Sequence, residues 1–271
     1  MKKLLLSVII LVVVAYVFLV IWKNREAAEP VVMEKPVALN PREHGPEQQE
    51  EPVKYPVPVP ESEPVPDTDT APDREPLPEL DESDAVILGA MAPLENGFRW
   101  RDFFPFESLV RHFVVTVDNL TSAKLPRRYR LIQAPGGNFL VRKDEGETLY
   151  IDPANDDRYG AYVRIAESVD LNGLVKVYRR FYPLFQRAYE ELGYPDRYFN
   201  DRLVEVIDHL LDAPEIRGPI ALKQPKVFYT FADPALEARS AGHKLMLRMG
   251  AYNCARIKAR LKILRELLTS F

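Results

Sequence analysis

The stretch that decides the fold class is LNGLVKVYRRFYPLFQRAYEEL, residues 171–192. Its apolar residues recur at alternating spacings of four and three, as they do along one face of an α-helix. This face consists of Leu174, Tyr178, Phe181, Phe185, Ala188 and Leu192. We therefore expect a long amphipathic helix that ends at Gly193. Pro183 cannot donate to the carbonyl of Arg179, so we expect a kink or two abutting helices there.

The segments around this stretch predict a mainly α domain over residues 84–271, preceded by one membrane helix and a disordered stalk. Residues 107–118 are ambiguous between helix and strand, because they include a β-branched run. Residues 138–142 and 148–151 predict a β-hairpin, and residues 227–231 could add a third antiparallel strand. The remaining helical patterns cover residues 83–92, 157–169, 197–212, 234–249 and 251–268.

Residues 1–25 predict a membrane anchor. Residues 4–22 contain no charged side chain, and a helix of that length rises about 28 Å, close to the thickness of the bilayer hydrocarbon. A cleaved signal peptide is the alternative, but its apolar region is shorter and small residues surround its cleavage site. Two basic residues precede the run and two follow it. The positive-inside rule therefore does not decide the orientation. Because long tails can translocate regardless of charge, we expect a single-pass protein of the bacterial inner membrane with its C-terminal domain in the periplasm.

Residues 26–83 predict a disordered, acidic, proline-rich linker. They contain 13 of the 24 prolines, and residues 26–84 carry 17 acidic against 4 basic residues. Proline blocks helices and sheet ladders, and the apolar content is too low to offset the entropy cost of ordering. The segment is either a passive spacer, which we favour, or a ligand for a proline-binding groove.

The chain contains no motif that predicts a reaction or a cofactor. Phosphate-binding glycine loops, dinucleotide fingerprints, H-E-x-x-H and G-x-S-x-G are all absent. Glu205, His209 and Asp212, with Asp201 one turn earlier, could share a helix face and bind a cation, but a solvated surface face is the interpretation we favour. The only cysteine, Cys254, has no base within reach in sequence, so we expect a buried small side chain rather than a nucleophile.

The last 32 residues are basic. They contain seven lysines and arginines against one acidic residue, Glu266. On the last predicted helix, the bases proposed as a basic surface are Arg256, Lys258, Arg260, Lys262 and Arg265. Such a helix could lie on anionic lipid or dock an acidic partner, but packing against the domain is favoured, because its apolar stripe matches an ordinary core face. The net charge of +5 for residues 85–271 is modest, and we expect no nucleic-acid partner.

Residues 80–271 resemble a bacterial family, the domain of unknown function 3014. The residues that carry the resemblance are Asp118-Asn-Leu120, Arg158-Tyr159, Tyr178, Pro183-Leu184, Ala188-Tyr189, Leu192-Gly-Tyr-Pro195, Tyr229, Ala232-Asp-Pro234, Leu236-Glu237 and Leu247-Arg-Met-Gly250. The resemblance implies a bacterial envelope protein built as a membrane helix, a proline-rich stretch and this domain. It implies no known activity and supplies no catalytic residues.

We therefore expect a binding or scaffolding module of the cell envelope, held off the membrane by its linker. The alternatives are an enzyme acting on an envelope polymer, and binding of anionic lipid or polymer through the C-terminal helix. The sequence does not decide the oligomeric state or the envelope partner. If the motif residues line a pocket, its members are Arg158, Tyr159, Tyr189, Tyr194, Asp233, Glu237 and Arg248. A structural role, with buried tyrosines and arginine links between helices, is the interpretation we favour for them.

Overall fold

The structure is a computed structural model that describes residues 52–58, 76–104, 107–125, 131 and 135–271. The chain divides into two units, residues 1–49 and 50–271, and the first lies wholly outside the described residues. The predicted membrane helix at 4–22 and most of the predicted linker therefore also lie outside them. Within the described residues, no helix combines the length and apolar character needed to cross a bilayer.

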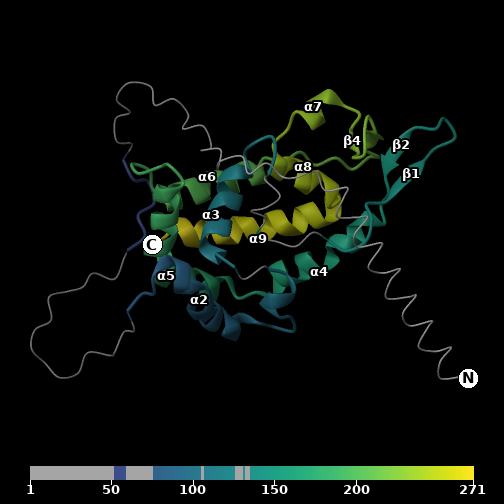
Figure 1. The fold of residues 1–271 in the computed structure, drawn as a ribbon. Coiled ribbons are helices and arrows are strands. Elements are labelled where there is room, and N and C mark those ends of the chain that lie inside the picture. Colours follow the sequence, from purple (N-terminus) through teal and green to yellow (C-terminus); the bar gives the residue numbers. More distant parts are fainter. Residues whose placement is uncertain (1–51, 59–75, 105–106, 126–130, 132–134) are drawn as a thin grey trace, which may run out of the picture. The chain divides into compact units, whose positions relative to one another are not determined.

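The prediction of a mainly helical domain is confirmed (Figure 1). The α-helices are α2 (Ser83–Met91), α3 (Leu109–Asn119), α4 (Asn155–Ser168), α5 (Leu171–Glu191), α6 (Phe199–Leu211), α7 (Pro234–Glu237), α8 (Ala241–Arg248) and α9 (Ala251–Thr269). Three short 3-10 helices, η1 (Leu80–Glu82), η2 (Ala92–Leu94) and η3 (Trp100–Asp102), flank α2 and precede α3. The ambiguous segment 107–118 is thus helical in α3, where Val110, Val114 and Val117 are buried on one face.

Helix α5 runs through Pro183 as one helix, so the expectation of two abutting helices is wrong. Its apolar face is buried on both sides of the proline, at Tyr178 and Phe181 before it and at Leu184 and Ala188 after it. Packing of one continuous face outweighs the single backbone hydrogen bond that proline removes. The helix ends as predicted, because Gly193 adopts a φ of +112° that favours glycine.

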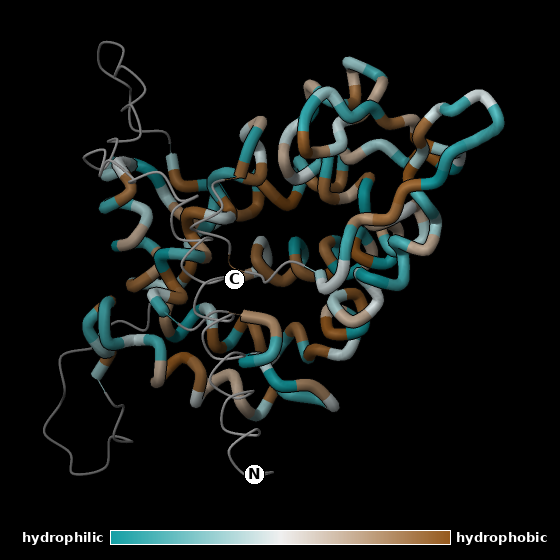
Figure 2. Tube along the Cα trace, turned by 45° about the vertical axis from the view of Figure 1, so that its right-hand side comes forward, coloured by the Kyte–Doolittle hydropathy of each residue, from teal (hydrophilic) through white to brown (hydrophobic). Residues whose placement is uncertain are grey.

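Helix α9 runs through the middle of the domain, with α4, α5, α6 and α8 packed around it (Figure 1). The largest hydrophobic cluster joins α3, α5 and α6 and includes Leu268 at the end of α9. Hydrophobic stretches of these helices face inward, and the tip of the β1–β2 hairpin is hydrophilic (Figure 2). Five of the seven bases in the last 32 residues lie on α9, so its central position brings them close to neighbouring helices.

A four-stranded antiparallel sheet lies at one end of α8, in the order β1 (Val141–Lys143), β2 (Leu149–Ile151), β3 (Ala221–Lys223) and β4 (Thr230–Phe231). The predicted hairpin is confirmed with Arg142 opposite Tyr150, and β4 falls within the predicted third strand. Strand β3 carries no alternating pattern long enough to predict. It pairs through Leu222, which packs with Phe231 and Leu247 of α8.

The prediction of one continuous helix over 234–249 is wrong, because two helices occupy this range. It is divided into α7 and α8 because Ser240 caps α8, with its Oγ accepting the N–H of His243 at 3.1 Å. The start of the helix predicted over 83–92 is confirmed. Helix α2 begins at Ser83, whose Oγ donates to the carbonyl of Leu80 at 2.8 Å.

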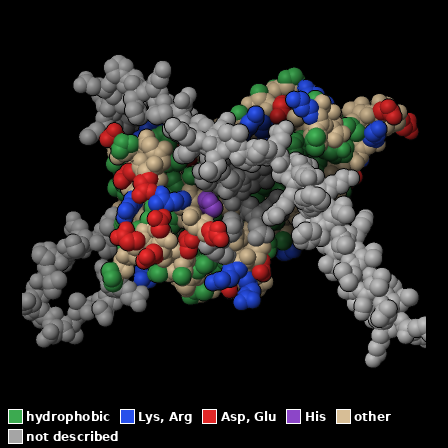
Figure 3. Space-filling view, viewed as in Figure 1, with side chains coloured by type: hydrophobic (Ala, Val, Ile, Leu, Met, Phe, Trp, Pro, Cys, Tyr) green, Lys and Arg blue, Asp and Glu red, His purple; other side chains and the backbone are tan. Residues whose placement is uncertain are grey.

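Parts of the predicted linker pack against the helical domain. Residues 52–58 lie against it, and Val57 is 4% exposed. Leu80 is also buried in the largest cluster, and Glu79 forms an ion pair with Arg187 of α5. Acidic and basic side chains lie close together on the left in Figure 3, and Arg111 and Arg187 form ion pairs with acidic residues. Composition favours disorder for these residues, but the domain supplies the apolar surface and hydrogen bonds that they lack locally.

Candidate functional site

The strongest candidate site is the surface of the domain that residues 52–58 of the same chain contact. We call these residues the self-segment and the surface that they contact the groove. In this segment Val57 is buried, Tyr55 is half-buried, and the other residues are exposed. Val57 belongs to the largest hydrophobic cluster and Tyr55 packs against it. The walls of the groove come from the start of α6 and the end of α9, more than 140 residues away in the chain.

Asp201 binds two consecutive amides of the self-segment. Its carboxylate oxygens accept the N–H of Lys54 and the N–H of Tyr55, each at 2.8 Å. Asp201 lies in the first turn of α6, where the helix dipole favours a negative charge. Hydrogen bonds to an ionised acceptor are about twice as strong as neutral ones, so Asp201 fixes the first half of the segment.

Tyr198 binds the second half of the self-segment. Its hydroxyl accepts the N–H of Val57 at 2.7 Å, and its ring packs 5.2 Å from the ring of Tyr182. The residue between the two bound positions is Pro56, which has no N–H to satisfy. Every backbone N–H from Lys54 to Val57 is therefore paired with an acceptor of the domain.

Asn200 is fully buried and joins the segment to two helices. Its Nδ2 donates to the carbonyl of Tyr55 at 2.9 Å and to the carbonyl of Leu268 at 3.2 Å. Its Oδ1 accepts the hydroxyl of Tyr178 at 3.2 Å. Burial raises the pKa of Tyr178 well above its usual range, so this hydroxyl remains a donor at neutral pH. The amide is thereby held in the orientation that presents its N–H group to the self-segment.

An ion pair lies beside the ring of Tyr55. Arg265 of α9 donates to Asp208 of α6 with Nη2 3.0 Å from Oδ2. The hydrogen bond from Asp208 raises the pKa of Arg265, and the hydroxyl of Tyr55 adds a smaller contribution in the same direction. Arg265 was predicted as part of a basic surface, and the structure places it at the wall of the groove.

The predicted pocket residues do not come together in one pocket. Arg158 donates to three consecutive carbonyls, those of Pro135, Gly136 and Gly137, at 3.1–3.3 Å, and so holds that turn. Tyr159 is buried in a small cluster that also contains Cys254. Burial raises its pKa. Both residues have structural roles on α4.

The other predicted pocket residues on the sheet side are also structural. Arg248 lies over the ring of Phe231, with its guanidinium carbon 5.3 Å from the centroid. Asp233 caps α7 by accepting the N–H of Ala235 at 2.8 Å. Glu237 accepts the N–H of Phe231 at 2.9 Å. These side chains tie β4 to α7 and α8.

Tyr189 and Tyr194 lie in a different cluster from Tyr159. Their rings stack with centroids 4.7 Å apart, and the Tyr194 hydroxyl donates to Asp118 at 3.3 Å. Arg202 of α6 also bonds to Asp118, at 3.0 Å. This group joins α3, α5 and α6.

Most of the predicted basic-surface residues on α9 bond to groups of the domain. Lys258 is 9% exposed and donates to the carbonyl of Ala213 at 2.7 Å. Arg260 donates to the carbonyls of Ala166 and Val169 at the end of α4, and Arg256 pairs with Glu167. Of the five, Lys262 is exposed. The central position of α9 turns most of these bases toward carbonyls and carboxylates of neighbouring helices.

The candidate cation ligands are engaged elsewhere. The ring of His209 stacks on His243 with centroids 4.0 Å apart, and its Nε2 lies 2.7 Å from Ser240 Oγ. Glu205 pairs with Arg202, and Asp201 binds the self-segment. Across the described ranges, no three His, Cys, Asp or Glu side chains are arranged to hold a metal ion. Cys254 is buried, and burial raises the pKa of its thiol.

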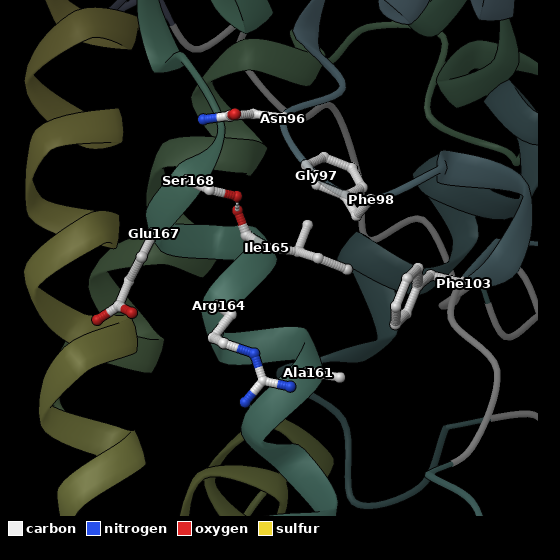
Figure 4. Close-up of a pocket in the computed structure, with 9 residues that line it drawn as sticks. All are labelled: Asn96, Gly97, Phe98, Phe103, Ala161, Arg164, Ile165, Glu167 and Ser168. Carbon is white, nitrogen blue, oxygen red and sulfur yellow. Dashed lines mark hydrogen bonds between the residues drawn. The ribbon is translucent and has the colours of Figure 1, made fainter.

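A separate open cleft of about 480 Å³ lies between α4 and the loop that follows η2. Phe98 and Phe103 face Ile165 of α4, and Glu167 points away toward α9 (Figure 4). Arg164 lies at the lower edge in this view. No candidate residue predicted from the sequence lines this cleft.

Sequence reasoning missed Tyr198 and Asn200, and it considered Asp201 only as a cation ligand. One signal was available: Tyr55 is the only aromatic residue between positions 26 and 83. An aromatic side chain in a solvated linker is unusual enough to indicate a docking residue.

The chain matches no curated protein and no solved structure. A family model described as "Protein of unknown function (DUF3014)" matches residues 109–265. This range contains the groove residues Tyr198, Asn200, Asp201 and Arg265 and excludes the self-segment. The predicted resemblance is thereby confirmed: the chain belongs to the DUF3014 family of proteins of unknown function.

Proposed function

We propose that this protein is a peptide-binding module of the bacterial cell envelope. In this proposal, residues 4–22 anchor it in the inner membrane, the domain lies in the periplasm, and the groove on α6 and α9 binds an extended, proline-containing peptide. The apolar run and the acidic proline-rich segment of the sequence support the anchor and the linker.

The observation that carries the binding function is the pattern of contacts to the self-segment. Asp201, Tyr198 and Asn200 satisfy four of its backbone groups, and a single side chain, Val57, is buried deeply. Recognition of an extended peptide commonly combines main-chain hydrogen bonds for affinity with side-chain pockets for specificity. The groove has both parts, and its polar groups are fixed by a buried network.

Lipid binding through α9 has less support. Its bases Arg256, Lys258, Arg260 and Arg265 are engaged by groups of the domain. A base that is already paired attracts an anionic surface less strongly. We therefore place the binding function at the groove and not on α9.

The test uses the full chain in detergent with residues 50–58 deleted, so that the groove is vacated. A labelled peptide of sequence EEPVKYPVPVP, residues 50–60, is titrated against it by fluorescence anisotropy. We expect saturable binding that is weakened when Asp201→Asn is added and is retained when the exposed Asp196→Asn is added instead. A vacated chain that stays folded and does not bind the peptide would contradict the proposal.

The location is tested separately, with a reporter active only outside the cytoplasm fused after Phe271. A signal is expected from the proposed periplasmic domain. A signal only from a cytoplasm-active reporter would contradict the proposed orientation and leave the peptide groove as it stands.

A further inference from the structure

We infer that the self-segment is an autoinhibitory ligand, and that the groove's external partner is another envelope protein with an extended segment of the pattern aromatic–proline–β-branched. This inference rests on the proposed function. It names the partner's chemistry and the way in which access to the groove is regulated.

The backbone contacts define which positions of a partner are recognised. The groove accepts N–H groups at the positions of Lys54, Tyr55 and Val57, and it donates to the carbonyl of Tyr55. No acceptor is needed at Pro56. Proline is therefore compatible with position 56 and excluded at positions 55 and 57, where its missing N–H would leave Asp201 or Tyr198 without a donor.

The side chains narrow the pattern further. Val57 is enclosed by the core, so position 57 requires a compact apolar residue, and a β-branched one loses little freedom in extended backbone. Tyr55 packs against the cluster, and its hydroxyl interacts with Arg265, so position 55 favours an aromatic residue with a polar tip. Lys54, Pro56 and Pro58 are exposed and contribute little selectivity through their side chains.

The connection to the domain makes the self-segment a strong competitor. Seventeen residues, 59–75, separate Pro58 from Pro76, and a connection of this length gives an effective concentration on the order of 1 mM. The self-segment therefore competes with a free peptide in the wild-type chain. The affinity of the peptide is lower there than in the vacated chain by a factor of 1 + C/Kd, where C is the effective concentration and Kd is the dissociation constant of the segment. For a dissociation constant of about 100 μM this factor is about ten.

The experiment titrates four peptides against three forms of the chain in detergent, each of which keeps residues 59–271. The chains are the wild type, the deletion of residues 50–58, and the double substitution Tyr55→Ser with Val57→Asp, which vacates the groove without shortening the chain. The peptides are EEPVKYPVPVP and its versions with Tyr55→Ala, with Pro56→Ala, and with an N-methyl group on the amide of Val57.

We expect the parent peptide to bind both vacated chains about equally and the wild type roughly tenfold more weakly. Loss of the Val57 N–H or of the Tyr55 ring should weaken binding to the vacated chains by roughly tenfold or more. Pro56→Ala should change it by less than about threefold, because no groove contact depends on that position.

Two outcomes would overturn the inference and leave the proposed function intact. Equal affinity for wild-type and vacated chains would mean that the self-segment does not block the groove. Equal affinity for all four peptides would mean that the pattern is not recognised. Absence of binding to two vacated chains that melt at the wild-type temperature would overturn the proposed function itself. Unfolding of both vacated chains would show that the self-segment is an obligatory part of the domain, which also contradicts both proposals.

Discussion

Replacing Asp201 with asparagine should release the self-segment while leaving the domain folded. The substitution keeps the size of the side chain but removes its charge, and it turns an NH₂ group toward one of the two amides that Asp201 now accepts. One hydrogen bond should therefore be lost and the other reduced to a neutral one. The rest of α6 packs through other residues, since Leu203, Val204 and Val206 are buried in the largest hydrophobic cluster.

The expected loss follows from the character of these two bonds. A hydrogen bond to a charged acceptor contributes about 1.5–3 kcal/mol, and a neutral one about 0.5–1.5 kcal/mol. Because the bond to Lys54 is exposed and the bond to Tyr55 is half-buried, the low ends of these ranges apply. The lost bond then costs about 1.5 kcal/mol and the weakened bond about 1 kcal/mol. The total is about 2.5 kcal/mol, which corresponds to roughly a sixtyfold fall in the ratio of docked to released segment.

Hydrogen exchange of the Val57 amide measures this ratio. Val57 does not contact Asp201 through its own N–H, which Tyr198 accepts, so its exchange reports release of the whole segment. With a docked-to-released ratio of about ten in the wild type, a roughly sixtyfold fall in this ratio releases most of the segment. We therefore expect the protection of Val57 to fall by nearly tenfold, to about that of a free segment, in Asp201→Asn and to be unchanged in Asp196→Asn. Amides in the middle of α5 should keep their protection in both variants. Unchanged protection at Val57 in a folded Asp201→Asn chain would refute the assignment of Asp201 as the main anchor.

Three further predictions concern the domain. Gly250→Ala should destabilise it by about 2 kcal/mol or more in urea unfolding, because Gly250 has a φ of +85° and an added Cβ would lie 2.1 Å from the Asp156 carboxylate; an unchanged midpoint would contradict this close approach. Burial lowers the pKa of His209 below 6.5, and the neighbouring His243 lowers it further. The unfolded chain therefore binds a proton at this residue more readily than the folded chain does. The free energy of unfolding should consequently fall as the pH drops below about 6.5. His209→Asn should flatten that slope, and an identical pH profile in the variant would refute it. Cys254 is buried with a raised thiol pKa, so a thiol reagent should modify the native chain far more slowly than the urea-unfolded chain, and equal rates would place the thiol at the surface.

The central position of α9 explains why its bases pair with groups of the domain. Lys258 and Arg260 belong to the basic C-terminal stretch, and both donate to carbonyls of neighbouring segments. Long basic side chains can bury their aliphatic stems and still satisfy their charged ends. Charge in a sequence therefore predicts that a partner exists, but not whether the partner is a membrane or the next helix.

Local signals in the sequence determined which elements form and where many of them end. The spacing along residues 171–192 determined α5, Gly193 its end, Asp233-Pro234 the start of α7, and Gly250 the start of α9. These features depend on side-chain periodicity and on backbone conformations that only a few residue types favour, so they can be predicted without knowledge of distant contacts.

Only the tertiary structure decided the fate of residues 52–58. By composition they belong to a disordered linker, because they cannot bury enough apolar surface among themselves. The acceptors at Asp201 and Tyr198 lie more than 140 residues further along the chain, and so does the donor at Asn200. The folding of α5, α6 and α9 brings these groups together and supplies the burial for Val57. The ordered conformation of residues 52–58 thus depends on contacts with distant parts of the chain, which no local sequence pattern encodes.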